Sequence, residues 1–401
     1  MHNAYSVCAH WGGPYEEAAL QAWAESLRAR LPGPDVSLGL LFMSPRFFDR
    51  AEAILELIRV HARVPLLLGC SSMSLITGAE EIEEAAGLCL GLYHLPGAEL
   101  TACRFSQSDL ESLSAPADWH RATGVTPDRC HGWLVFADPF QLDCEGWLKS
   151  WNEAYAPAPV LGGLASGEPG AQFTQVYLNG DVLREGGVAL SVGGQVGLAG
   201  VISQGCTPIG ETWTITKAER NIIMEIANRP AYEVLNHTVQ QLSAWDQRNA
   251  GGNLFIGLVT DEYREEFHRG DFLVRNLIGA DPVTGILAVG AFPRTGQTIQ
   301  FQRRDADSST EDMQAHLEEA RRRLHGRTIY GGCLCSCNGR GQRLFGSPHH
   351  DARHVQEHLG PFGLTGFFCN GELGPVGELS FLHGYTASLA LFVDREPPPA
   401  R

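Results

Sequence analysis

Three cysteines at alternate positions stand out as candidates for chemistry: Cys333, Cys335 and Cys337 in the stretch "GGCLCSCNGRG" (331–341). On a strand, side chains at every second position share a face, and their Cα atoms lie roughly 6.6–6.8 Å apart. That spacing is at the outer limit for a disulfide, and structural zinc sites place their cysteines on a knuckle instead of a strand. The pattern therefore predicts a buried strand with a row of small side chains. Its last member, Cys337, can face a pocket beside an arginine that lowers its pKa.

The turn that follows, "NGRG" (338–341), can present polar groups to such a pocket. It lacks the lysine and the glycine spacing of a phosphate loop. Arg340 can hold a ligand carboxylate in a two-pronged grip, or it can pair with Glu372 or a nearby aspartate and brace the turn. The later stretch "CNGELG" (369–374) echoes "CNGRG" and places Glu372 on a similar turn. An arginine and a glutamate on two such turns suit an amino acid, which is a zwitterion.

Further candidates lie at predicted strand ends and turns. Ser71 and Ser166 follow two apolar runs, at the sheet edge where α/β proteins bind ligands. The nucleophile elbow Gly-x-Ser-x-Gly is absent. Cys206 or Cys337, with His383 as base, stays open as the centre of a thiol enzyme or redox sensor. His350, His354 and His358 lie at helical spacing, but the first and last are about 12 Å apart, so we predict a polar helix face and no metal site.

The apolar runs predict strands at 36–44, 64–74, 132–140 and 159–170 and an amphipathic helix at 14–31. A strand–helix–strand unit occurs twice, at about 36–100 and 130–200, with Gly69 aligned to Gly163. A charged helix is expected to end before Pro230, and another helix is expected at 231–243. The fold class is therefore α/β, mixed α+β, with two domains that each carry a mixed β-sheet covered by helices.

Composition limits the functional classes. The 401 residues carry a formal charge of −16, which disfavours nucleic acid and anionic membranes as partners. No stretch approaches 18 apolar residues, so no membrane span is expected. The N-terminus has no signal-peptide pattern, and 11 scattered cysteines are typical of reduced thiols. We therefore expect a cytoplasmic protein with no cofactor.

The order of motifs resembles the FIST family over roughly residues 14–393. The motifs are "LLLGCSSMSLITG", "LVFADPF", "VLGGLASG", "SQGCTPIGETW", "GDFLVRNLIGADPVTGILAVG", "CNGRGQRLFG" and "GFFCNGELGPVG". The resemblance implies an N-terminal FIST domain at 1–216, a C-terminal one at 217–394 and a frayed tail at 395–401. It adds Arg304 and Asp305 to the candidate ligand-binding residues, which are Ser71, Ser166, Cys206, Cys337, Asn338, Arg340, Glu372 and His383. The cysteines at 333 and 335 depart from the expected pattern.

The resemblance implies a sensory module, and we expect a binding protein rather than an enzyme. Our first hypothesis is a signal-transduction protein that binds a small ligand, an amino acid or similar carboxylate metabolite, and passes its state to a signalling partner. The alternatives are a thiol enzyme or redox sensor at Cys337 or Cys206, and a protein-interaction scaffold.

Overall fold

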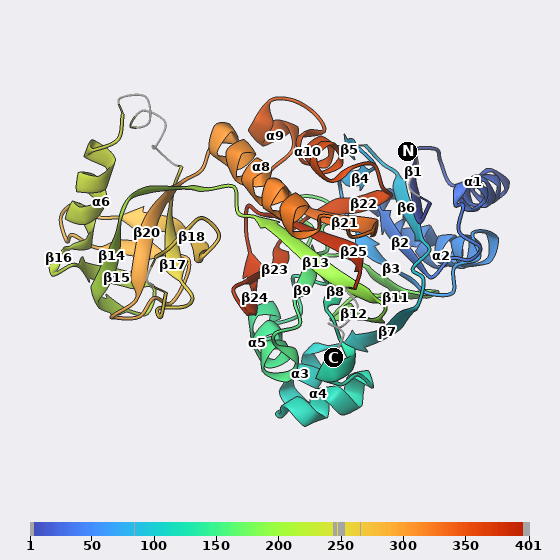
Figure 1. The fold of residues 1–401 in the computed structure, drawn as a ribbon, viewed down its shortest axis with the longest axis horizontal. Coiled ribbons are helices and arrows are strands. Elements are labelled where there is room, and N and C mark those ends of the chain that lie inside the picture. The colour runs from blue at the N-terminus through green and yellow to red at the C-terminus, as the bar shows by residue number, and fades with distance from the viewer. Residues whose placement is uncertain (1–3, 84, 244–246, 248–252, 265, 396–401) are drawn as a thin grey trace. The chain divides into compact units, whose positions relative to one another are not determined.

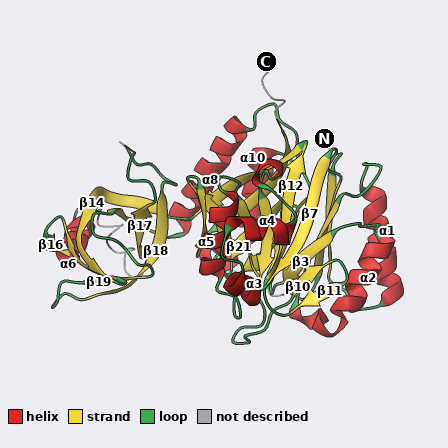
Figure 2. Cartoon of the chain, turned by 90° about the horizontal axis from the view of Figure 1, so that it is seen from below, coloured by secondary structure: helices red, strands yellow, loops and turns green. Residues whose placement is uncertain are grey.

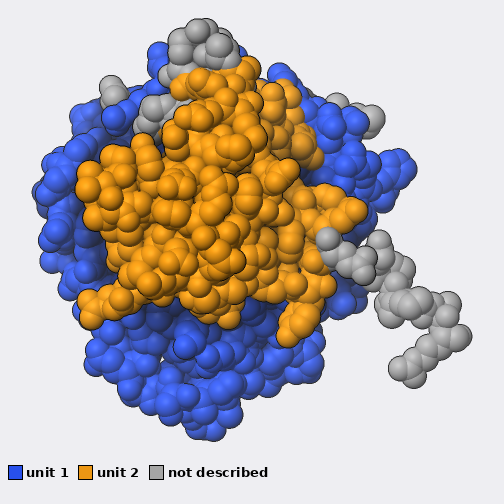
Figure 3. Space-filling view, turned by 90° about the vertical axis from the view of Figure 1, so that its left-hand side faces the viewer, with its two compact units in different colours: residues 1–202, 316–401 blue, residues 203–315 orange. Residues whose placement is uncertain are grey.

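The computed structural model describes residues 4–83, 85–243, 247, 253–264 and 266–395 (Figure 1). It has the predicted mixed α/β class, with four sheets and covering helices. The chain divides into two compact units, residues 1–202 with 316–401 (unit 1) and residues 203–315 (unit 2), which Figure 3 colours separately. These units cut the chain differently from the domain boundary expected at residue 216, which stays a prediction about sequence domains. Apart from Arg395, the expected tail at 395–401 lies outside the described residues.

Unit 1 contains the predicted strand–helix–strand unit three times. In each copy two parallel strands are joined by a helix that crosses over between them. The copies are β2 (Leu38–Met43), α2 (Ala51–His61) and β3 (Leu67–Ser71); β8 (Trp133–Ala137), α5 (Cys144–Tyr155) and β9 (Val160–Leu164); and β21 (Ile329–Cys337), α10 (His350–Leu359) and β22 (Leu364–Cys369).

Each copy is completed by the same flanking strands. A long strand returns antiparallel to the first strand of the copy: β6 (Leu88–Tyr93), β12 (Gly187–Gly194) and β25 (Ala387–Asp394). Beyond it lies an outer strand: β1 (Ser6–Trp11), β7 (Ala98–Phe105) and β13 (Val196–Ser203). Three six-stranded sheets result, one for each copy.

The three sheets are interlocked because each copy lends a hairpin to another sheet. The hairpins are β4 (Leu75–Thr77) with β5 (Glu80–Ile82), β10 (Val176–Leu178) with β11 (Asp181–Leu183), and β23 (Glu372–Val376) with β24 (Leu379–His383). The first copy's hairpin pairs with β22, the second copy's with β3 and the third copy's with β9. The exchange is cyclic, so no copy can complete its sheet alone.

Strand register aligns the copies residue by residue. One glycine in each second strand lies against a backbone carbonyl of the first strand: Gly69, Gly162 and Gly366, where an added Cβ would come within 1.7, 2.0 and 1.9 Å of the carbonyl oxygen. Gly69 is therefore equivalent to Gly162, and the alignment with Gly163 drawn from the sequence was wrong by one residue. The strand pairs differ in their loops, and only the register shows this shift.

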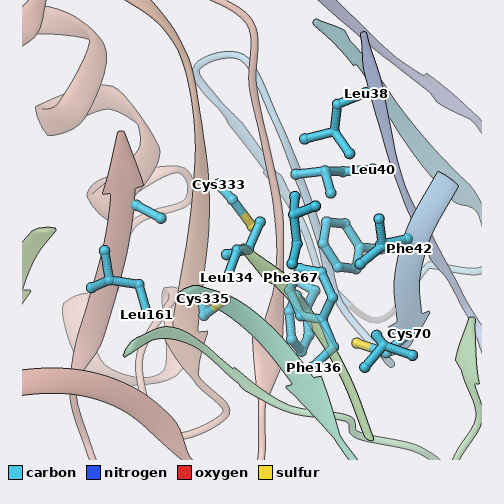
Figure 4. Close-up of a cluster of buried hydrophobic side chains, with 14 of the residues drawn as sticks. Leu38, Leu40, Phe42, Cys70, Leu134, Phe136, Leu161, Cys333, Cys335 and Phe367 are labelled. Atoms are coloured by element: carbon cyan, nitrogen blue, oxygen red, sulfur yellow. The ribbon is translucent and has the colours of Figure 1, made fainter. Parts of the chain in front are cut away.

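The centre of unit 1 is an apolar core to which all three sheets contribute. The rings of Phe42, Phe136 and Phe367 meet there with centroids 4.6 to 5.7 Å apart (Figure 4). Cys333 and Cys335 are fully buried in the same core, as predicted for a strand with small side chains. Cys335 occupies the place of Phe42 and Phe136, while Phe367 occupies the place of Cys70 and Gly163. The third copy thus carries its ring on the neighbouring strand.

Helices cover the outer faces of the sheets. Helix α1 (Glu17–Arg30) and α2 pack on the sheet that carries β3 and β10 (Figure 2). Helices α4 (Pro116–Thr123) and α5 pack on the second copy's sheet through a cluster of tryptophans. The remaining short helices of unit 1 are η1 (Pro45–Arg50), α3 (Gln107–Ser112), η2 (Pro127–Arg129) and α9 (Gln342–Phe345).

Unit 2 is a sheet that closes on itself, because β14 pairs with β15 as well as with β20. Its strands are β14 (Thr207–Glu219), β15 (Ile222–Ile226), β16 (Arg229–Pro230), β17 (Leu254–Val259), β18 (Phe272–Ala280), β19 (Leu287–Val289) and β20 (Thr298–Arg303). Helix α6 (Ala231–Gln240) adds Val234 and Leu235 to its core, and α8 (Ala306–Arg323) follows β20.

The charged helix expected before Pro230 was wrong, because that stretch forms β14 and β15. Arg220 (φ 51°) and Asn228 (φ 59°) take the left-handed conformation at the turns on either side of β15. The isoleucines between them fitted a helical spacing as well as a strand, and the two turns decide for the strand.

Candidate functional site

The two echoing turns lie side by side at the ends of β21 and β22. Cys337 and Cys369 are paired in the parallel ladder. Beyond them, Asn338 Nδ2 donates to Asn370 Oδ1 at 2.9 Å, and the backbone N–H of Asn338 donates to the Cys369 carbonyl at 3.1 Å. We call residues 337–341 and 369–372 together the double turn. Asn338 and Asn370 are exposed on it.

Arg340 is fully buried beneath this surface. Its Nε donates to Asp351 Oδ2 at 2.7 Å, and its Nη2 donates to Asp351 Oδ1 at 2.9 Å. Burial raises the pKa of Asp351, but the charge and hydrogen bonds of Arg340 outweigh it and hold that pKa below its usual range. Arg340 Nη1 lies 3.5 Å from the Tyr385 carbonyl. The side chain thus braces the turn, with Asp351 as the carboxylate that it grips.

Glu372 is the other buried ionisable residue of the double turn. Its Oε1 accepts from the Cys369 thiol at 3.2 Å and its Oε2 from the Thr386 N–H at 3.0 Å. Burial raises the pKa of Glu372 to about 8. His383 lies directly across the hairpin from Glu372 and is also buried, with Nε2 3.0 Å from the Gly374 carbonyl. The structure therefore brings Cys337, Asn338, Glu372 and His383 into one neighbourhood.

Tyr385 is a member of this neighbourhood that the sequence did not indicate. It is half-buried and has φ 64°, a strained conformation for an aromatic residue. A Cβ placed on Gly339 would lie 3.6 Å from the Tyr385 ring and 3.7 Å from Cys337 Sγ. The ring thus borders the double turn beside the half-buried Cys337. No sequence pattern predicts such a residue, because the left-handed conformation is ordinarily taken by glycine or asparagine.

Glu81 was also missed, and it links the first copy's hairpin to the third copy. Its Oε1 accepts the Ala352 N–H in the first turn of α10 at 3.0 Å. Burial, with Asp351 nearby, raises the pKa of Glu81 to about 7. Its backbone N–H donates to His349 Nδ1 at 2.9 Å. These contacts attach β5 to the helix that carries Asp351.

Ser71 and Ser166 lie where the strand ends of all three copies meet. Ser166 Oγ donates to the Phe368 carbonyl at 2.6 Å, and Ser71 Oγ donates to the Ser166 carbonyl at 2.9 Å. Ser72 Oγ donates to the same Phe368 carbonyl at 2.7 Å. All three serines are buried. Their hydroxyls tie the three sheets together.

Cys206, Arg304 and Asp305 belong to unit 2. Cys206 and Arg304 are buried there. Asp305 Oδ1 accepts the Ser308 N–H at 2.7 Å and so caps the start of α8, while Oδ2 lies 2.9 Å from Arg303 Nε. These three residues form a group of their own within unit 2.

The histidines of α10 are stacked along one helix face, and His350 Nδ1 lies 2.9 Å from Asp351 Oδ1. Among the described residues, no group of three or more His, Cys, Asp or Glu side chains is placed to hold a metal ion. No helix in the described part of the chain is long and apolar enough to cross a membrane.

Two cavities of unit 1 lie away from the double turn. One, of about 430 Å³, is lined by β1, Arg30 and residues 361–363. The other, of about 520 Å³, lies between β7 and β11 and is lined by Arg104 and Arg184. Arg104 forms an ion pair with Asp181, and Arg184 lies over the Phe173 ring. None of the predicted site residues lines either cavity.

Comparison with known proteins gives the family. The FIST N domain matches residues 37–229 and the FIST C domain matches residues 231–375. Uncharacterized protein Rv0628c of Mycobacterium tuberculosis is 34% identical over 377 residues, covering 94% of this chain and 96% of its own length. Uncharacterized protein Mb0898c of Mycobacterium bovis is 35% identical over 382 residues with the same coverage. A cyanuric acid hydrolase from A. caulinodans aligns over 98% of this chain and 99% of its own, with 8% identity and a TM-score of 0.33.

The two matched domains and the full-length relatives confirm the resemblance drawn from the motifs. The chain belongs to the FIST family, whose domains are sensory domains of signal transduction.

Proposed function

We propose that this chain senses a small metabolite with an amino group, an amino acid in the first instance, at the double turn and reports its presence to a signalling protein. The observation that carries the proposal is the place of Glu372. Its equivalents in the other two copies are Leu75 and Val176, both in the central core. Burying a carboxyl group is costly, and the sister copies fold with an apolar residue at this position. An acid kept at such a position points to a binding or switching role.

The asparagines above Glu372 support recognition of a donor. The Ala165 carbonyl accepts a hydrogen bond from Asn370 Nδ2 at 3.0 Å, which fixes the orientation of that amide. Asn370 Oδ1 therefore accepts from Asn338 Nδ2, and Asn338 directs its own Oδ1 away from this chain of hydrogen bonds. An exposed acceptor above a buried acid suits a ligand ammonium group, and the Tyr385 ring can add a cation–π contact.

Arg340 has a positioning role in this proposal. Its guanidinium is engaged by Asp351, so it holds the turn and the Tyr385 carbonyl in place. The part of the ligand that the site recognises is then the amino group, and a carboxylate on the ligand is secondary.

The signal begins at Glu372. A ligand ammonium nearby favours the ionised carboxylate and lowers its pKa. Glu372 holds the Thr386 N–H, and Cys337 N–H donates to the Thr386 carbonyl at 2.9 Å. A change in the charge of Glu372 therefore acts on the connection between β24 and β25, where a partner protein can detect it.

The test is calorimetric titration and thermal shift with amino acids, the corresponding amines and N-acetylated amino acids. A ligand at a hundredfold excess over its Kd raises the free energy of unfolding by about 2.7 kcal/mol. We expect binding by amino acids and amines and none by the acetylated forms. Glu372→Gln and Asn338→Ala should each weaken binding about tenfold or more, equivalent to about 1.4 kcal/mol.

Asn236→Ala is the matched control, because Asn236 is an exposed asparagine on α6. It should leave binding unchanged. Equal binding of acetylated ligands, or unchanged affinity in both Glu372→Gln and Asn338→Ala, would remove the double turn as the site.

A further inference from the structure

We propose that Cys337 and Cys369 form a peroxide-sensitive thiol pair, which a hydroperoxide converts to a disulfide with Glu372 as the proton carrier. This modification site is independent of the ligand proposed above, although it uses the same buried acid.

The three copies differ at the positions of Cys337 and Cys369. The equivalents of Cys337 are Ser44 and Asp138, and those of Cys369 are Ser72 and Ala165. Neither sister copy has a thiol at either position, and neither has an acid at the position of Glu372. The third copy alone places two thiols and a carboxyl group together on this shared backbone.

The positions of the two cysteines in the strand ladder suit a disulfide. Cys337 and Cys369 are direct neighbours in the parallel ladder, at the last residue of each strand. Neighbouring strands lie roughly 4.7–4.9 Å apart, within the Cα range of roughly 4.4–6.8 Å that disulfides span. Cys335 and Cys369 both face the central core, and Cys337 follows Cys335 by two residues, so both partners lie on one face. At strand ends the backbone can adjust to the remaining mismatch.

The two thiols share one carboxyl group, that of Glu372. The Cys369 thiol donates to Glu372 Oε1 at 3.2 Å, and the Cys337 thiol also hydrogen-bonds to Glu372. Two thiols on one carboxyl group are brought toward each other. Cys337 is half-buried and so within reach of a small oxidant, whereas Cys369 is buried, as suits a resolving partner.

Formation of the disulfide takes two chemical steps. In molecules whose Glu372 is ionised, Cys337 Sγ passes its proton to the Glu372 carboxylate and attacks one peroxide oxygen. The O–O bond breaks, the leaving oxygen takes the proton, and Cys337 becomes a sulfenic acid while the hydroperoxide is reduced to an alcohol or water. Cys369 Sγ then attacks Cys337 Sγ and passes its proton through Glu372 to the departing hydroxide. The products are the disulfide and one water.

Cys333 and Cys335 of the central core do not compete with this pair. Cys333 and Cys335 are fully buried, and their positions on one strand are too far apart for an easy disulfide. Cys103 is half-buried on β7, away from the double turn, and serves as the matched control for exposure.

The experiment treats the full chain with hydrogen peroxide, traps sulfenic acid with dimedone, and identifies the linked peptides by mass spectrometry. In the native sequence we expect a Cys337–Cys369 link. Cys369→Ser should instead accumulate dimedone-labelled Cys337, Cys337→Ser should leave Cys369 reduced, and Glu372→Gln should slow oxidation of Cys337 about tenfold. Cys103→Ser should behave as the native chain.

The variants are chosen to fold. Ser44 already occupies the position of Cys337, while Ser72 and Ala165 occupy that of Cys369, so Cys369→Ala is a second usable variant. Oxidation of Cys337 no faster than that of Cys103, or a link that joins other cysteines, would overturn the proposal. Amino-acid binding by the native chain, together with no Cys337–Cys369 link after peroxide treatment, would separate the failure of this proposal from that of the proposed function.

Discussion

The first two copies in unit 1 and the third copy share a backbone but differ where their strands end. After β2 and β8 the chain turns at Pro45 and Pro139, whereas after β21 it turns at Asn338. Asp138, which is itself buried, secures its turn through the backbone, with Oδ2 accepting the N–H groups of Phe140 and Gln141 at 3.0 and 2.7 Å. The third copy secures its turn with the buried pair of Arg340 and Asp351.

The difference teaches which features the fold requires. Glycine against a carbonyl recurs in all three copies, so it belongs to the strand packing. A buried pair of arginine and aspartate, a glutamate at the position of Leu75 and Val176, and two facing thiols occur in the third copy alone among the described residues of the three copies. Because two copies reach the same architecture without them, these groups are candidates for function. The predictions below test that separation.

The largest effect is expected from breaking the buried ion pair. Asp351→Asn leaves the Arg340 charge without its carboxylate in a fully buried place, and such a loss costs about 3–5 kcal/mol. The midpoint of denaturant unfolding measures it. Arg343→Ala is the control, because Arg343 is exposed on α9, and it should change stability by less than about 0.5 kcal/mol. Equal midpoints for Asp351→Asn and the native chain would mean that the turn does not depend on the pair.

The next effect is the pH dependence that Glu372 confers. Burial raises the pKa of Glu372 in the folded chain to about 8, from an ordinary value of 4.5. The folded state therefore keeps a proton that the unfolded state releases, so stability is fully present below pH 4.5 and is lost as the pH rises to about 8. Because each pKa unit corresponds to about 1.4 kcal/mol, the loss over the whole range is at most about 5 kcal/mol. Glu81 contributes in the same direction up to about pH 7.

Unfolding midpoints at pH 5, 7 and 9 measure this dependence. Glu372→Gln keeps an acceptor for the Thr386 N–H and should flatten the profile, while Glu81→Gln should flatten only its lower part. A native profile that rises with pH over this range would show that Glu372 is ionised in the folded chain, and the comparison with Leu75 and Val176 would lose its force.

The sequence predicted individual strands of this fold better than the relation between segments that lie far apart in the chain. Apolar runs predicted the strands of the first two copies, because each is continuous and ends in a turn. The third copy escaped notice because residues 203–315 separate it from the others, and because Cys333 and Cys335 replace the Leu and Phe of its sisters. Gly366, within the apolar run at 364–368, was the nearest signal, although it follows β21 at a longer spacing than Gly69 follows β2.

The candidate site was predictable in part for the same reason. The echo of "CNGRG" and "CNGELG" predicted two similar turns that carry Arg340 and Glu372, and the structure places these turns side by side because both motifs end paired strands. Asp351 lay in a stretch dominated by histidines, and nothing local links it to Arg340. Cyclic exchange of hairpins brings Glu81 to α10, and no single segment encodes such an exchange.

The smallest effect tests the central core, where the copies differ by exchange of a ring between strands. Phe42 and Cys70 are ladder partners in the first copy, and Cys335 and Phe367 are ladder partners in the third with the order reversed. Cys335→Phe adds a second ring beside Phe367 in a filled core, and overpacking costs about 1–3 kcal/mol. Adding Phe367→Cys restores the first copy's arrangement and should recover most of that loss. A double-mutant cycle on unfolding free energies measures the coupling. Strictly additive costs would mean that the third copy's core is shaped by its own surroundings, and that the equivalence of the copies ends at the backbone.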